Sequence, residues 1–165
     1  MKIEQIYTGC LAQGAYYISS NGEAAIVDPL RETAPYINRL EKDGVKLKYI
    51  FETHFHADFV SGHLDLKNKT GAEIVYGPTA QAGFESIVAE DGQEFKIGDI
   101  TIKVLHTPGH TMESSTFLLK DENGKAVRDE KNRIQFKDEE ALNSFKKDLA
   151  SKYNVPVESV LTYDE

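Results

Sequence analysis

Two histidines and an aspartate lie within five residues of this chain, at His54, His56 and Asp58. They follow residues 47–52, an apolar segment with the composition of a short buried strand. Residues two apart point to the same side of an extended chain, so these side chains can converge on one point if the chain turns there. The pattern alone leaves two interpretations open: a metal site at a strand end, or a surface loop that happens to contain two histidines.

A third histidine favours the metal site. His110 follows an alternating strand predicted over residues 100–105 and comes directly after Pro108 and Gly109. Proline restricts the backbone and glycine permits a sharp bend, so this turn holds His110 in a defined position. Together with Asp58, the three histidines form a nitrogen and oxygen ligand set that suits zinc, iron or manganese. The sequence therefore predicts a metal site where two strands end.

The elements that must position these residues alternate along the chain. Helices are predicted over residues 32–42 and 59–67, where apolar residues recur at helical spacing or a glycine supplies the stop. Strands are predicted over residues 3–7, 15–18, 24–27, 47–52, 73–76, 100–105 and 115–119. This alternation predicts a layered α/β fold with helices covering strands, and the 165 residues suit a single domain.

The chain changes character after residue 126. Residues 127–133 are nearly all charged, which is typical of a solvated loop. A helix with one apolar face is predicted over residues 138–153, and Asp138 is suited to cap its N-terminus. Residues 127–165 are therefore expected to be a divergent tail of the same domain.

Composition narrows the classes of partner. A formal net charge of -8 without a Lys/Arg stripe argues against binding to nucleic acid or to an acidic membrane surface. The single cysteine, Cys10, rules out an intrachain disulfide and suits a reducing cytoplasm. Residues 1–5 lack the apolar core of a signal peptide, and no apolar run reaches membrane-spanning length. We expect a soluble, cytoplasmic protein with a small or cationic partner.

The motifs together resemble a known family. T-H-F-H-A-D at 53–58 and T-P-G-H-T at 107–111, with I-G-D-I-T-I-K-V-L between them, look like the metallo-β-lactamase-fold superfamily, and within it most resemble the persulfide dioxygenases. G-C-L-A-Q-G-A-Y at 9–16, I-V-D-P at 26–29 and S-G-H at 61–63 fit as well. The resemblance covers residues 1–126. It implies an αββα sandwich that is incomplete, with the N-terminal half followed by a divergent C-terminal helix.

The resemblance also implies a site. The superfamily pattern His-x-His-x-Asp-His serves two metals, but Phe59 stands where the last histidine would be, and an aromatic ring cannot coordinate. A single metal is therefore expected. Persulfide dioxygenases are similar in holding one iron, which implies Fe²⁺ bound by the residues matching His54 and His110. His56 and Asp58 would then act in catalysis by orienting ligands and waters.

The third ligand is not evident. Family members carry it as the aspartate of a Phe-Thr-Gly-Asp segment after the strand at 115–119, and this segment does not occur in the sequence. Asp138 is the candidate replacement, although a helix-capping role explains its position more simply. Asp129 is explained more simply as a solvated residue of the charged loop.

The implied activity is oxidation of a small thiol persulfide, such as glutathione persulfide, by O₂ to sulfite. Two alternatives stay open. One is a Zn²⁺ thioester hydrolase of the glyoxalase II type, in which metal-bound hydroxide attacks the substrate. The other is a truncated or redesigned metal-binding domain without activity. An unfinished sheet edge would favour a homo-oligomer in any of these cases.

Overall fold

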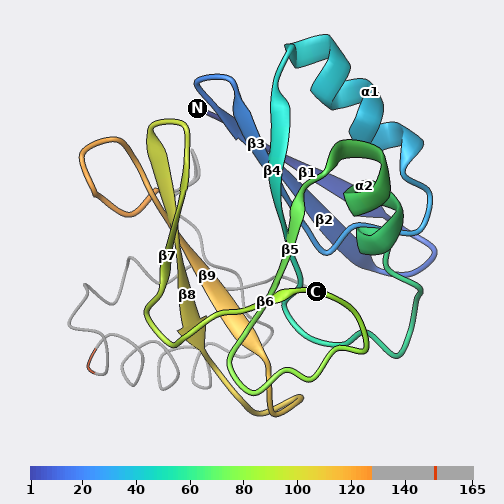
Figure 1. Ribbon diagram of the computed structural model, residues 1–165, viewed down its shortest axis with the longest axis vertical. Coiled ribbons are helices and arrows are strands. Elements are labelled where there is room, and N and C mark those ends of the chain that lie inside the picture. Colours follow the sequence, from blue (N-terminus) through green and yellow to red (C-terminus); the bar gives the residue numbers. More distant parts are fainter. Residues whose placement is uncertain (128–150, 152–165) are drawn as a thin grey trace.

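The computed structural model describes residues 1–127 and Ser151. This part of the chain forms two β-sheets and two helices (Figure 1). The larger sheet has six strands in sequence order, β1 (Lys2–Thr8), β2 (Gln13–Ser20), β3 (Glu23–Val27), β4 (Lys46–Phe51), β5 (Glu73–Tyr76) and β6 (Ile87–Val88). The smaller sheet has three, β7 (Glu94–Ile97), β8 (Ile100–His106) and β9 (Ser115–Lys120).

The larger sheet is mixed. Strands β1 to β3 pair antiparallel through tight turns, whereas β3 to β6 pair parallel. Parallel neighbours need a crossover, and the helices α1 (Ala34–Asp43) and α2 (His63–Thr70) supply the first two. Neither described helix has the length and apolar character needed to cross a membrane.

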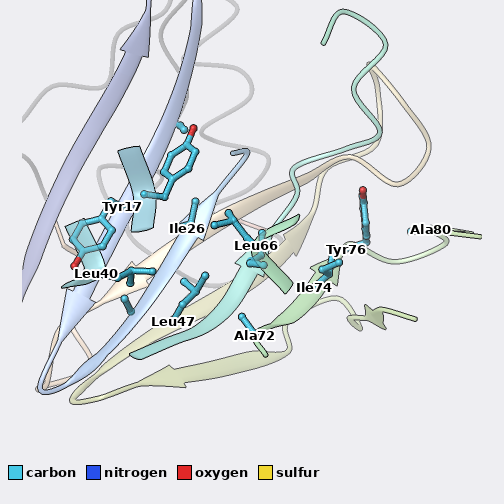
Figure 2. Packing of buried hydrophobic residues seen from close by; sticks show 13 residues of the cluster. Tyr17, Ile26, Leu40, Leu47, Leu66, Ala72, Ile74, Tyr76 and Ala80 are labelled. Carbon is cyan, nitrogen blue, oxygen red and sulfur yellow. The ribbon is translucent and has the colours of Figure 1, made fainter. Parts of the chain in front are cut away.

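Two hydrophobic cores separate three layers. The first core lies between the helices and the larger sheet, and Figure 2 shows Leu40 and Leu66 from the helices meeting the sheet residues Ile26, Leu47 and Ile74. The second core lies between the two sheets and includes side chains from β3, β4, β5, β7, β8 and β9. Strands β3 to β5 are therefore covered on both faces, which explains why each ends in consecutive buried apolar residues.

Aromatic contacts join the two sheets near the ends of β4 and β9. The ring centroid of Phe51, the last residue of β4, lies 5.5 Å from that of Phe95 and 5.0 Å from that of Phe117. These residues come from β4, β7 and β9, so one cluster ties both sheets together directly before the loop that contains His54. Packing of this kind holds the sheets at a fixed separation.

The layered α/β fold predicted from the sequence is confirmed, and the largest shift of a boundary is at the second helix. The second helix begins at His63 rather than at residue 59, because Gly62 N–H donates to Pro29 O (2.8 Å) and Leu30 bridges to Ser61. These bonds hold residues 59–62 as a loop. Strand β6 is not among the strands predicted from the sequence. The predicted helix 138–153, with Asp138, lies outside the described residues.

Gly98→Ala is expected to lower the free energy of unfolding by about 2 kcal/mol, because both backbone and space oppose a side chain there. Gly98 has φ +53°, and a Cβ on it would overlap the carbonyl group of Ser20. Gly22→Ala is the matched control, since Gly22 has φ +82° with nothing within 4 Å of an added Cβ. Urea unfolding should show the larger loss for Gly98→Ala, and equal losses would contradict the role of close packing.

Candidate metal centre

Three histidine rings meet where β4 and β8 end. The ring centroid of His54 lies 4.2 Å from that of His56 and 4.8 Å from that of His110. The first two rings belong to the loop after β4, and His110 belongs to the loop between β8 and β9. The structure thus brings together the three histidines that the sequence singled out.

Backbone hydrogen bonds hold the two loops side by side. Ser115 N–H, at the start of β9, donates to Thr53 O (2.9 Å) beside His54. Within the second loop, Thr107 N–H donates to Ser114 O (2.9 Å) and closes the turn around His110. Because both bonds are backbone bonds near a buried sheet junction, the separation of the histidines depends on the sheet geometry.

A relay through Thr53 defines the protonation of His54. Asp28 accepts from Thr53 N–H at Oδ1 (2.7 Å) and from the Thr53 hydroxyl at Oδ2 (2.8 Å). The same hydroxyl oxygen lies 2.9 Å from His54 Nδ1. Its only proton goes to Asp28, so the oxygen accepts from Nδ1–H of His54 and leaves the Nε2 lone pair for a ligand.

The electrostatics of His54 favour the same form. Burial lowers the pKa of His54, and the nearby His56 lowers it further. The ring is therefore neutral at neutral pH, which is the form that binds a metal ion.

A second group of possible ligands lies behind the histidines. The group consists of Asp28, Glu52 and His56, and each offers one ligand atom, a carboxylate oxygen or a ring nitrogen. These three atoms lie within 4.8 Å of one another, so this triad can also hold a metal ion. His56 Nε2 is 3.1 Å from Asp28 Oδ1 and 3.6 Å from Glu52 Oε2. Burial opposes protonation of His56, but the neighbouring Asp28 and Glu52 carboxylates outweigh it and raise the pKa of His56.

Glu52 is the most deeply buried charged side chain of this group. Ser61 Oγ donates to Glu52 Oε1 (2.6 Å), and His63 Nδ1 lies 3.3 Å from the same oxygen. Among the described residues, Glu52 Oε2, His56 Nε2 and His63 Nδ1 are buried without a hydrogen-bond partner. Buried polar atoms without partners are costly, and a metal ion held by Asp28, Glu52 and His56 would give partners to Glu52 and His56. The donor set therefore fits a metal ion.

Glu52→Gln is expected to stabilise the metal-free protein at mildly alkaline pH by about 1 kcal/mol or more, because it removes a buried charge and keeps the side-chain shape. Burial and the charge of Asp28 raise the pKa of Glu52 well above its ordinary value of 4.5. The folded state then binds this proton more tightly than the unfolded state, so wild-type stability falls as the pH rises above 4.5 toward the folded-state pKa. Urea unfolding in chelator across this range should show a shallower decline for Glu52→Gln, and an unchanged decline would contradict the assignment.

The remaining predicted site residues are placed differently. Asp58 Oδ1 lies 3.8 Å from His56 Nδ1, and the Asp58 side chain is 67% exposed. Phe59 packs its ring on His56 at 4.2 Å. Asp138 lies outside the described residues.

Sequence reasoning missed Asp28 and Glu52, which are 3% and 0% exposed. Each ends an apolar strand segment, and a charged residue at the end of a buried strand was the available signal.

A cavity of about 310 Å³ opens behind His56. Aromatic and aliphatic side chains form most of its wall, and Phe55, Phe59, Tyr76 and Phe84 are among them. His56, Glu52 and His63 also line it, so the buried polar group borders an apolar space.

Sequence comparisons place this arrangement among known proteins. The model of the Metallo-beta-lactamase superfamily matches residues 8–125. A hydroxyacylglutathione hydrolase of Rhodopseudomonas palustris (strain BisB5) is 36% identical over 118 residues, which make up 68% of this chain and 46% of that protein. A hydroxyacylglutathione hydrolase of Rhizobium etli is 44% identical over 92 residues, or 53% of this chain and 34% of that protein.

Solved structures show the same likeness. A metallo-beta-lactamase from Staphylococcus aureus subsp. aureus COL has a TM-score of 0.71 and 35% identity, covering 77% of this chain and 40% of that chain. ETHE1 from Myxococcus xanthus has a TM-score of 0.67 and 27% identity, covering 72% of this chain and 54% of that chain. The chain therefore spans roughly half the length of these relatives, or less.

The resemblance read from the motifs is thus confirmed at the level of the superfamily. The matched segment takes in His54, His56 and His110 together with the strands from β2 to β9. With a family model matched over residues 8–125, the chain belongs to the metallo-β-lactamase superfamily.

Proposed function

We propose that this chain carries the metal-binding half of a mononuclear iron enzyme that oxidises a small thiol persulfide, such as glutathione persulfide, with O₂ to sulfite. The observation that carries the proposal is Phe59, whose ring packs on His56 at 4.2 Å where a second metal would need an imidazole. The persulfide dioxygenase-like motifs and the likeness to ETHE1 support the same reading.

In this proposal, Fe²⁺ is held by His54 and His110, with Asp138 as the candidate carboxylate. When bound there, Fe²⁺ would supply the redox chemistry with O₂ and a position for the persulfide sulfur. Thr53 and Asp28 hold His54 in the tautomer with a free Nε2. His56 and Asp58 orient waters and ligands at the rim of the site.

Anaerobic loading with Fe²⁺ followed by addition of glutathione persulfide tests the proposal. We expect oxygen uptake that depends on both iron and persulfide, with sulfite as the product. Full iron occupancy without oxygen uptake would overturn the activity while leaving the metal site intact.

A Zn²⁺ thioester hydrolase is the second candidate. The hydroxyacylglutathione hydrolases that match at 36% and 44% identity favour it. In that case a metal-bound hydroxide would attack a glutathione thioester. Hydrolysis of S-lactoylglutathione by the zinc form, without oxygen uptake by the iron form, would select this function.

A metal-binding domain without activity is the third candidate. It is supported by the lack of a Phe-Thr-Gly-Asp segment after the strand at 115–119 in this sequence. Metal binding without either reaction would identify it. For any of the three we propose a cytoplasmic location, no nucleic-acid or membrane partner, and possible assembly through an open sheet edge.

A further inference from the structure

Glu113 links the two loops that carry the histidines. It lies in the loop between β8 and β9, after His110, and is 8% exposed despite its charge. Its Oε1 accepts a hydrogen bond from the backbone N–H of Phe55 (3.0 Å), which lies 58 residues earlier in the chain. Phe55 stands between His54 and His56, so this bond reaches the backbone of the first loop at its centre.

The residue that Glu113 holds is restrained at both ends. The ring of Phe55 packs on Tyr76 of β5, with centroids 4.6 Å apart. Its amide is held by Glu113 of the loop between β8 and β9. Although Phe55 is 38% exposed, its ring contact and its amide bond both restrain it, and the directions of His54 and His56 follow from its backbone.

The Glu113 backbone is itself closely packed. A Cβ on Gly77, just after β5, would lie 2.5 Å from Glu113 O and would overlap the side chain of Ser115. Only a glycine allows this approach. The end of β5 therefore packs closely against the backbone of Glu113 and limits its movement.

The carboxylate is held in its charged form. Burial alone would raise the pKa of Glu113, but hydrogen bonds from the N–H groups of Phe55 and of Glu113 itself and from the Thr111 side chain outweigh it and lower the pKa. A charged acceptor makes a stronger bond to an amide than a neutral one does.

We infer that Glu113 is a positioning residue: its carboxylate, by accepting from Phe55 N–H across the sheet junction, sets the separation of His110 from His54 and His56. The inference rests on the proposed metal site formed by these histidines. Glu113 touches neither metal nor substrate in this role. It acts through the backbone of the first loop.

Co²⁺ binding to the full chain, followed by its visible absorption spectrum, tests this role. Glu113→Ala is expected to weaken Co²⁺ binding about ten- to hundredfold, the range found when groups that orient ligands are removed, and to change the spectrum. Glu113→Gln keeps an oxygen acceptor for Phe55 N–H and should restore most of the affinity. Glu122→Ala, which removes an exposed carboxylate of the turn after β9, is the control and should bind Co²⁺ as the wild type does.

Hydrogen exchange in the metal-free protein provides a second readout. The Phe55 amide should exchange faster in Glu113→Ala, while the Ser115 amide, bonded to Thr53 O, should keep its protection. Unchanged Phe55 exchange, or equal Co²⁺ affinity in wild type and Glu113→Ala, would overturn the role of Glu113. Absence of Co²⁺ binding to the wild type would instead overturn the proposed metal site, and the exchange of Phe55 would still decide whether Glu113 joins the loops.

Discussion

His54→Ala is expected to lower the affinity of the protein for Fe²⁺ or Zn²⁺ by at least about a hundredfold, because loss of a direct ligand should exceed the ten- to hundredfold loss caused by removing an orienting group. His54 is the ring that connects the other two, with centroids 4.2 Å from His56 and 4.8 Å from His110. It is also the ring whose Nε2 the Thr53 hydroxyl leaves free. Competition with a chromophoric chelator measures the affinity.

The buried triad of Asp28, Glu52 and His56 supplies the matched comparison. If the metal binds between His54, His56 and His110, Glu52→Gln should retain most of the metal affinity that His54→Ala loses. If the metal binds instead between the carboxylates, the order of the two variants reverses, since Glu52 is then the direct ligand and His54 is not. Retention of full affinity by both variants would exclude both positions.

Asp28→Ala is expected to lower the free energy of unfolding by about 3 kcal/mol, since it leaves two part-buried donors of Thr53 without their acceptor and removes the carboxylate beside His56. Thr53 N–H and the Thr53 hydroxyl both donate to this carboxylate, and His56 Nε2 lies 3.1 Å from it. Asp28 also has φ +47°, a backbone conformation that aspartate tolerates better than alanine. Chemical unfolding in the presence of a chelator measures the loss without a contribution from metal.

Asp28→Asn is the matched control. Asparagine keeps an oxygen for Thr53 N–H and accepts the left-handed conformation, so we expect it to lose about 1 kcal/mol. Removal of Asp28 also relieves repulsion with Glu52, which acts in the opposite direction. An Asp28→Ala variant as stable as the wild type would show that this relief outweighs the lost partners.

Much of the fold could be predicted from local pattern. The strands β3, β4 and β5 are recognisable because each ends in consecutive apolar residues, which are buried on both faces of the sheet. Helix α1 is recognisable from its apolar spacing and from Gly44, which ends it in a left-handed conformation. The second helix begins at His63 rather than at residue 59, because backbone contacts with Pro29 and Leu30, about 30 residues earlier in the chain, hold residues 61–62 outside the helix. No local pattern records such a bond.

The candidate site also contains residues that the sequence could predict and residues that it could not. His54, His56 and His110 could be singled out because metal-ligating residue types at strand ends are a local property of the chain. Glu52 and Asp28 could not be assigned, since a charged residue at a strand end is more often solvated than buried. They are buried because β3 and β4 are parallel neighbours, so the loops that follow them lie at the same edge of the sheet and cover both residues.

The sequence by itself determined the ligand types, their strand-end positions and the replacement of a metal-binding imidazole by Phe59. The tertiary structure alone decided which charges share the site. Asp28 meets Thr53 across 25 residues and Glu113 meets Phe55 across 58, and both contacts exist because parallel strands and two packed sheets bring separate loops to one edge. Hydrophobic patterning specifies which faces are buried, whereas the partner of a buried carboxylate depends on how those faces pack.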